Sequence, residues 1–352
     1  MKKITVKASR EYEIIIDKGL IDRAGEYCLC ALGKPCRALV LTDDNVAPLY
    51  LDRVKASLDK GGFEVNEFLI PHGEPSKSTE SLVEILEFMA QCRLTRSDIL
   101  VALGGGVVGD LGGFAAAVYL RGIEFVQMPT TLLAAVDSSV GGKTAVDLVA
   151  GKNLMGAFHQ PALVLCDPLT LDTLPDDIFA DGSAEVIKYG VINDREFFDT
   201  LKNGIREQIE DIIAACVKNK ARIVEGDEFD KGQRQLLNLG HTVGHAIELC
   251  SGLEISHGRA VAMGMVIAMR GAVALGLCAE EELSELIDII RSASLPTECD
   301  FSAEELYAVA TSDKKRAGDR IKLVLPYGIG DCRLYEIKVS ELRGFIEKGL
   351  GL

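Results

Sequence analysis

Polar side chains recur at helical spacing between residues 234 and 248: Arg234, Asn238, His241, His245 and Glu248. Steps of four, three, four and three residues place them along one stripe if the whole segment is a single helix. A core helix does not carry so many polar groups on one face, and a solvated face would favour Lys and Glu over histidines and an asparagine. We therefore expect a helix over residues 235–251 whose stripe lines a cleft, with a solvated stripe as the alternative.

Histidines four residues apart can share a metal ion, as they do in the H-E-x-x-H motif of metalloproteases. Thr242 stands where that motif has its catalytic glutamate, which argues against a metalloprotease. His257 precedes the next expected helix, and Glu185 lies on an earlier one. The sequence thus gathers imidazoles and carboxylates in this half of the chain. His72 and His159 have no such neighbours in sequence, and we expect them to be loop or packing residues.

A glycine-rich run from Leu103 to Asp110 follows an expected strand and opens an expected helix. Such a turn lets the backbone approach a pyrophosphate at the helix N-terminus, and the run fits G-x-G-x-x-G. No clear acidic residue ends a following strand at the distance typical of a dinucleotide site. We expect a variant phosphate-binding turn, with an ordinary tight turn as the alternative.

The run Gly141–Thr144 resembles the tail of a P-loop, but Asp137 occupies the position at which the P-loop spacing requires glycine. The P-loop interpretation therefore fails. Asp137, Lys143, Lys152 and Asn153 still crowd into a glycine-rich stretch with few other charges. This favours a site for an anionic substrate over a set of turn residues.

The elements that must position these residues change in character along the chain. Apolar runs typical of strands alternate with amphipathic segments in the first half, which predicts a parallel sheet flanked by helices. The expected strands are residues 1–10, 37–41, 64–70, 98–103, 123–128 and 162–166, and the helices between them are residues 47–60, 78–92 and 107–118. After about Pro175, segments of helical period follow one another: 177–191, 195–209, 211–225, 235–251, 259–277, 280–292 and 303–312. Only residues 321–326 and 332–337 look extended there.

We therefore predict an α/β protein, with an N-terminal Rossmann-like parallel-sheet domain over residues 1–174 and a mainly α-helical metal-binding and substrate-binding domain over residues 175–352. The formal net charge of −15 argues against nucleic acid and anionic membranes as partners. The 10 cysteines are scattered and form no CxxC pair, which is typical of a reducing cytoplasm. The apolar stretch 260–278 contains Arg270 and is expected to be a buried helix that does not cross a membrane.

Ordered motifs along nearly the whole chain resemble the 3-dehydroquinate synthase family. They lie at residues 42–46, 71–77, 104–113, 121–122, 129–143, 151–153, 182–188, 237–248 and 257–265. The string Leu-Asn-x-Gly-His-Thr-x-Gly-His-Ala-x-Glu at residues 237–248 is the most specific of them. The resemblance implies an NAD- and metal-dependent carbon–oxygen lyase of the shikimate pathway that acts on a sugar acid phosphate, 3-deoxy-D-arabino-heptulosonate 7-phosphate.

By the same resemblance, zinc or cobalt would be held by Glu185, His241 and His257. His245 would then handle protons or support a ligand, contrary to the bare spacing argument. Residues implied to contact NAD are Asp44, Asn45, Glu74, Lys77, Gly105, Gly106, Val107, Asp110, Thr130, Thr131, Asp137, Lys143, Lys152 and Thr173. Residues implied to surround the substrate are Asp137, Lys143, Lys152, Asn153, Lys188, Arg234, Asn238, His245 and one of Lys314 or Lys315. Arg121 resembles an arginine that reaches the phosphate from a neighbouring subunit, which implies a homodimer.

The chain also departs from the family pattern. Ala135 replaces a common glutamine, Ala145 and Asp147 alter the usual Gly-Val-Asn sequence, and Arg259 stands where glutamate is common. None of these positions is among the residues assigned above to catalysis.

Three other functions remain open from the sequence. A cyclase that makes 2-deoxy-scyllo-inosose or a valiolone would share fold, NAD and zinc, but Arg234, Asn238 and His245 favour the dehydroquinate branch. A metal-dependent polyol dehydrogenase similar to glycerol dehydrogenase would release NADH. A non-catalytic NAD-binding sensor would bind the cofactor without turnover.

Overall fold

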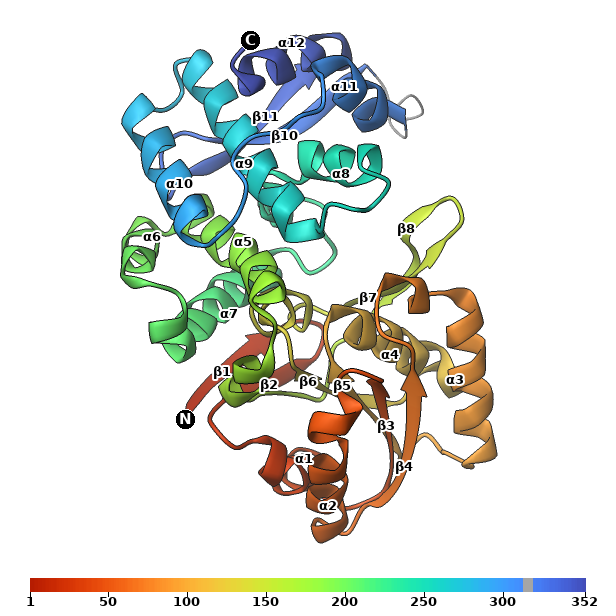
Figure 1. Cartoon of the computed structure of the whole chain (residues 1–352). Helices are drawn as coiled ribbons and strands as arrows, with labels where there is room; N and C mark the ends of the chain where they lie inside the picture. The colour runs from red at the N-terminus through yellow and green to blue at the C-terminus, as the bar shows by residue number, and fades with distance from the viewer. Residues whose placement is uncertain (313–318) are drawn as a thin grey trace. The chain divides into compact units, whose positions relative to one another are not determined.

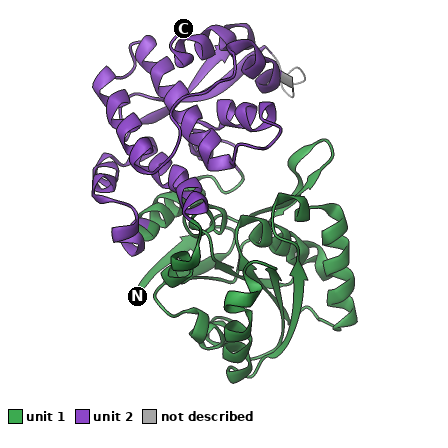
Figure 2. Ribbon diagram, viewed as in Figure 1, with its two compact units in different colours: residues 1–175, 213–229 green, residues 176–212, 230–352 purple. Residues whose placement is uncertain are grey.

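The computed structural model describes residues 1–312 and 319–352, which form two compact units (Figure 2). The first unit comprises residues 1–175 and 213–229, and the second comprises residues 176–212 and 230–352. The division after Pro175 lies next to the boundary expected at residue 174. Residues 213–229, which the sequence prediction placed in the helical domain, group with the first unit.

A seven-stranded sheet with the order β1-β2-β9-β6-β5-β3-β4 forms the centre of the first unit (Figure 1). Its strands are β1 (Lys2–Lys7), β2 (Glu11–Ile16), β3 (Arg37–Asp43), β4 (Glu64–Ile70), β5 (Ile99–Gly104), β6 (Glu124–Pro129) and β9 (Leu163–Cys166). Neighbouring strands are parallel except for the β1–β2 pair, which is antiparallel. The predicted parallel α/β architecture is confirmed, although the second strand of the antiparallel edge was not predicted.

Successive residues of the central strands enter two different cores, one on each face of the sheet. In β3, Ala38 and Val40 belong to one core, whereas Leu39 and Leu41 belong to the other. Every residue of β5 is buried. Burial on both faces explains why these strands are continuous apolar runs in the sequence.

Helices cover both faces of this sheet. Residues of α1 (Ala24–Leu32) and α2 (Asp52–Lys60) enter the first core, and residues of α3 (Thr79–Gln91) and α4 (Gly106–Val118) enter the second. Because α4 begins immediately after β5, the predicted strand–turn–helix order around the glycine-rich run is confirmed.

A two-stranded antiparallel hairpin, β7 (Lys143–Leu148) and β8 (Gly151–Phe158), follows β6 in the chain. Most of β8 is solvent-exposed. The sequence did not predict this hairpin, because the glycines and the exposure of β8 give no apolar run of the kind that marks a buried strand.

Helices dominate the second unit, as predicted. They are α5 (Asp176–Asn193), α6 (Arg195–Thr200), α8 (His241–Cys250), α9 (His257–Ala274), α10 (Glu280–Ser292), α11 (Ala303–Ser312) and α12 (Val339–Leu350), with α7 (Ile209–Gly226) contributing residues to both units. Residues predicted to be extended form the antiparallel pair β10 (Arg320–Pro326) and β11 (Cys332–Lys338).

Short helical turns link these elements. The 3-10 turns are η1 (Ile21–Arg23), η3 (Glu74–Ser76), η4 (Tyr119–Arg121), η6 (Pro168–Thr173), η7 (Leu201–Asn203), η8 (Arg206–Gln208) and η9 (Gln233–Asn238), and the π-helical turns are η2 (Ala47–Leu51) and η5 (Ala134–Ser138).

The prediction of one helix over residues 235–251 is wrong. The 3-10 turn η9 ends before Gly240, which has a left-handed φ of 78°, and α8 begins only at His241. A Cβ atom at residue 240 would lie 2.7 Å from the backbone oxygen of Val261 on α9. Close packing between α8 and α9 therefore requires the break, and the polar side chains of this segment do not form one continuous stripe.

The expected helix over residues 195–209 is also interrupted. It divides into α6, η7 and η8, and Gly204 between the last two has a φ of 89°. The apolar stretch around Arg270 forms α9, most of whose residues are buried, as expected. Within the described residues, the helices are all too short or too polar to cross a membrane.

Candidate active site

Three side chains of the second unit meet at one point. Glu185 comes from the middle of α5, His241 from the first residue of α8 and His257 from the first residue of α9. The Nε2 atoms of His241 and His257 lie 3.5 and 3.4 Å from Oε1 of Glu185. One ligand atom from each residue falls within 4.8 Å of the others. This group is called the metal trio below.

The start of α9 is fixed by Asp181, one turn before Glu185 on α5. Its Oδ1 accepts hydrogen bonds from the Ser256 hydroxyl, at 2.5 Å, and from the Arg259 N–H, at 3.1 Å. A Cβ atom on Gly258 would lie 1.9 Å from the Asp181 carbonyl oxygen. The side-chain cap and the close backbone contact together set the distance between α5 and the histidine at the start of α9.

The surroundings shift the pKa values of the two imidazoles in opposite directions. His241 Nδ1 lies 3.0 Å from the Leu239 carbonyl oxygen, so a proton on Nδ1 leaves the Nε2 lone pair directed at the trio. Burial, reinforced by nearby Lys188, lowers the pKa of His241 well below its usual value and keeps this ring neutral. Burial also disfavours the His257 cation, but two neighbouring carboxylates outweigh it and raise the pKa of His257 to about 10.

Glu185 is almost completely buried, with 2% of its side chain exposed. Lys188 and both imidazoles lie within ion-pair range of its carboxylate oxygens. A buried carboxylate beside two imidazole nitrogens is a donor set suited to a divalent ion with an open coordination position. The residues present therefore fit such an ion.

Glu248, on α8, contacts the His257 ring, which residue spacing alone did not indicate. Its Oε2 lies 3.3 Å from Nδ1 of His257, on the side of the ring opposite the metal trio. A carboxylate at this position fixes the ring and its tautomer, as outer partners of metal-binding histidines commonly do. The pairing crosses from one helix to the next, so it could not be read from residue intervals.

His245 lies next to the trio without belonging to it. Its ring centre is 5.3 Å from that of His241 and 6.0 Å from that of His257. With Glu248 and His257 it forms a second group whose potential ligand atoms lie within 4.8 Å of one another. The two groups share His257.

The other residues predicted in this half of the chain occupy varied positions. Lys188 forms a buried ion pair with Glu185. Arg234, on η9, is 1% exposed, whereas Asn238 at the end of the same turn is exposed. The alternatives Lys314 and Lys315 lie outside the described residues.

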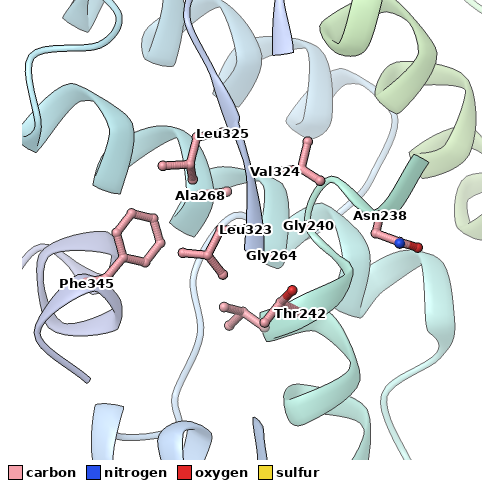
Figure 3. A pocket seen from close by; sticks show the side chains of 10 residues that line it. Asn238, Gly240, Thr242, Gly264, Ala268, Leu323, Val324, Leu325 and Phe345 are labelled. Atoms are coloured by element: carbon pink, nitrogen blue, oxygen red, sulfur yellow. The ribbon is translucent and has the colours of Figure 1, made fainter. Parts of the chain in front are cut away.

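A small hollow beside the start of α8 is lined largely by apolar side chains (Figure 3). Leu323, Leu325 and Phe345 border it, and Asn238 and Thr242 are the polar side chains at its rim. None of the metal trio lines it. We interpret the hollow as a packing gap.

The glycine-rich turn of the first unit forms a cradle at the start of α4. Thr130, which follows β6, donates its N–H to the Gly104 carbonyl oxygen at 3.0 Å. A Cβ atom on Gly105 would lie 3.0 Å from the Thr131 methyl group, and one on Gly106 would lie 3.3 Å from Ser138 Oγ. The predicted NAD residues here are thus close together, and the first N–H groups of α4 are suited to a phosphate.

Lys77 is the centre of a second cluster in the first unit. Its Nζ donates to Asp110 Oδ2 on α4 and to Asn153 Oδ1 on β8, both at 2.6 Å. Burial lowers the lysine pKa, but Asp110 outweighs this and raises it. Burial raises the pKa of Asp110 and of Glu74, and Glu74 lies 3.8 Å from Lys152 Nζ. Residues predicted for NAD and residues predicted for substrate therefore meet here.

Lys220, on the part of α7 that belongs to the first unit, is a residue that the sequence did not single out. Its Nζ donates to the Asp137 carbonyl oxygen at 2.8 Å and forms an ion pair with the Asp137 carboxylate. Its long sequence separation from Asp137 left no local signal.

His72 also has a partner that the sequence did not indicate. Its Nδ1 and its N–H each lie 2.8 Å from Asp44 Oδ1, and this contact lowers the pKa of Asp44. His72 was expected to be a loop or packing residue and lies in a loop, but its contact with a predicted NAD residue was not expected. The Thr173 hydroxyl lies 2.6 Å from that of Tyr50.

The remaining predicted residues of the first unit are at the surface. Asn45 donates its N–H to Asp43 Oδ1 at 3.0 Å. Lys143 begins β7 and is exposed. Arg121 ends η4, is exposed, and has a φ of 70°.

Two family models match consecutive parts of the chain. The model of the 3-dehydroquinate synthase N-terminal region matches residues 67–181, and the model of its C-terminal region matches residues 182–316. The chain belongs to the 3-dehydroquinate synthase family. The 3-dehydroquinate synthase of Caulobacter vibrioides is 47% identical, over 97% of this chain and 96% of the relative. That of Clostridium acetobutylicum is 44% identical, over 94% of both chains.

Solved structures of related cyclases share the fold. A 2-deoxy-scyllo-inosose synthase complexed with carbaglucose-6-phosphate, NAD⁺ and Co²⁺ matches with a TM-score of 0.88 at 25% identity, over 99% of this chain and 100% of that chain. A 2-epi-5-epi-valiolone synthase from Streptomyces hygroscopicus with NAD⁺ and Zn²⁺ bound matches with a TM-score of 0.87 at 26% identity, over 99% of each chain. The glycerol dehydrogenase of Schizosaccharomyces pombe, at 16% identity and a TM-score of 0.69, shares the fold alone.

Proposed function

We propose that this chain catalyses the 3-dehydroquinate synthase reaction. It converts 3-deoxy-D-arabino-heptulosonate 7-phosphate to 3-dehydroquinate and phosphate by transient NAD-dependent oxidation, phosphate elimination, re-reduction and intramolecular aldol closure. The observation that carries the proposal is the metal trio, with its buried carboxylate, in a chain of this family. The 42–47% identity to several 3-dehydroquinate synthases, against 25–26% to the two other cyclases named above, favours this substrate within the fold.

Zinc or cobalt would be held by Glu185, His241 and His257. When bound, the metal would acidify a coordinated substrate hydroxyl, and NAD would accept and return a hydride. Glu248 fixes the His257 ring from behind. Lys188 balances the buried Glu185 charge and offers a cationic group beside the trio.

The cationic groups proposed to contact the substrate anions are Lys143, Lys152, Lys188 and Arg234. Close charge-assisted hydrogen bonds outweigh the screened field of an acidic protein. Asp137, Asn153, Asn238 and His245 complete the proposed substrate set.

NAD would be held in the first unit. The N-terminus of α4, with Gly105, Gly106 and Val107, is proposed for its phosphates. The further NAD residues proposed are Asp44, Asn45, Glu74, Lys77, Asp110, Thr130, Thr131, Asp137, Lys143, Lys152 and Thr173.

The organisation of the chain completes the proposal. We propose an NAD-binding domain over residues 1–174, a metal and substrate domain over residues 175–352, and a cytoplasmic homodimer of the shikimate pathway in which Arg121 reaches the partner's site. The exposed position of Arg121 supports the proposed homodimer. The scattered free cysteines support a cytoplasmic location.

The test is incubation of the zinc-loaded protein with NAD and the heptulosonate phosphate. We expect phosphate release without net accumulation of NADH, and 3-dehydroquinate as the organic product. Net NADH would indicate a polyol dehydrogenase, and NAD binding without phosphate release would indicate a sensor. Phosphate release from glucose 6-phosphate in place of the heptulosonate would indicate a different cyclase.

A further inference from the structure

The β7–β8 hairpin contains an irregularity at the residues proposed to bind substrate. Val146 pairs with Met155 and Leu148 pairs with Gly151, so β7 advances by two residues while β8 advances by four. Residues 152–154 therefore form a bulge opposite residue 147. Bulges of this kind interrupt the ladder of backbone hydrogen bonds and redirect side chains, and they recur next to active sites.

Asp147 supplies the contact that the ladder lacks at this bulge. Its Oδ1 accepts the Asn153 N–H at 2.7 Å. Asn153 has a φ of 58°, in the left-handed region that residues other than glycine seldom adopt. The Asp147 N–H in turn donates to the Lys77 carbonyl oxygen at 2.8 Å. One residue thus connects the bulge to the loop before α3.

The side chain of Asn153 is held as well as its backbone. Its Oδ1 accepts from Lys77 Nζ, which also donates to Asp110 on α4. The bulge is therefore fixed at two atoms of the same residue. Lys152, directly before it, is 38% exposed, so this arrangement orders exposed polar groups and buries little apolar surface.

We infer that Asp147 is a positioning residue, which holds Asn153 in its left-handed conformation and thereby fixes Lys152 and Asn153 in the arrangement that binds the phosphorylated sugar acid. The role in substrate binding rests on the proposed function. The group proposed to act is the carboxylate oxygen as a hydrogen-bond acceptor. An amide oxygen at the same position can accept the same N–H.

Kinetics of the zinc-loaded enzyme with NAD test the substrate part of this inference. Asp147→Ala should raise the KM for the heptulosonate phosphate by about tenfold, the usual worth of one good hydrogen bond. It should also weaken NAD binding to a smaller extent, because Lys152 is proposed to contact NAD as well, and it should change kcat little. Asp147→Asn should stay within about threefold of wild type, because the acceptor remains. Val149→Ala, at the exposed tip of the same hairpin, is the matched control and should leave all three quantities unchanged.

Amide hydrogen exchange at Asn153 tests the positioning itself and needs no substrate. Exchange should accelerate by about tenfold in Asp147→Ala and remain slow in Asp147→Asn. Unchanged exchange in Asp147→Ala, or an Asp147→Asn variant as impaired as the alanine variant, would overturn the inference. A wild-type enzyme that releases no phosphate would instead refute the proposed function, and the exchange experiment would still decide the role of Asp147.

Discussion

The metal trio of the second unit and the Lys77 cluster of the first unit are built by opposite means. The trio lies on three helices whose backbones touch, and glycines such as Gly258 permit those contacts. The Lys77 cluster joins a loop, a helix and an exposed bulged hairpin through hydrogen bonds between charged and polar side chains. Packing therefore sets the geometry of the first, and side-chain chemistry sets that of the second.

This difference predicts different responses to substitution. A close-packed backbone contact has no room for an added atom. An atom inserted there pushes the helices apart and disturbs their whole arrangement. A hydrogen bond between side chains at an exposed hairpin can be removed or replaced one group at a time. The four substitutions below run from the largest expected effect to the smallest.

His241→Ala should remove a ligand of the trio altogether. We expect loss of bound zinc and a fall in activity well beyond the ~100-fold that is typical when a partner behind a metal ligand is lost. Metal analysis of the purified protein and phosphate-release kinetics check this. Retention of both zinc and turnover would contradict the ligand assignment.

Gly258→Ala should disrupt the contact between α5 and α9. An added Cβ would lie 1.9 Å from the Asp181 carbonyl oxygen, and overpacking of this kind costs about 3 kcal/mol of unfolding free energy. Urea unfolding measures the change. Gly344→Ala on α12 is the matched control, because nothing lies within 4 Å of its added Cβ. Equal stability of the two variants would mean that backbone packing does not set the site.

Glu248→Gln should weaken zinc binding by about tenfold while leaving the three ligands in place, because the amide orients the His257 ring less strongly. A competitive chelator titration measures the affinity. Activity should recover at high zinc concentration. An unchanged zinc affinity would show that Glu248 does not support the ring.

Lys152→Ala should have the smallest effect on the fold. Its contact with Glu74 joins two partly exposed groups 3.8 Å apart, so the unfolding free energy should change by less than ~1 kcal/mol. The KM for substrate should still rise, because a proposed anion contact is lost. Strong destabilisation would show that side chains of the Lys77 cluster stabilise the fold. It would contradict the proposed difference between this cluster and the close-packed metal trio.

Local signals in the sequence predicted much of the fold. Alternating strand and helix patterns, and the glycines at residues 104–106, correctly indicated the parallel sheet and the turn before α4. The break at Gly240 was not predicted, because it depends on contact with Val261 of another helix. The β7–β8 hairpin was missed because an exposed, glycine-containing strand lacks an apolar run.

The candidate site was less accessible to sequence reasoning alone. Spacing gathered His241 and His245 on one helix, but only the resemblance to a family assigned Glu185 and His257 as metal ligands. The contact of Glu248 with His257 and that of Lys220 with Asp137 join segments distant in sequence or on different helices, so residue intervals carried no sign of them.

Anomalous diffraction at the zinc edge, from crystals of the zinc-loaded protein, tests the central claim most directly. We predict a single ion bound by Glu185, His241 and His257, with a coordination position left open. An ion bound instead by His245, Glu248 and His257 would contradict the account, since it would leave Glu185 outside the coordination sphere.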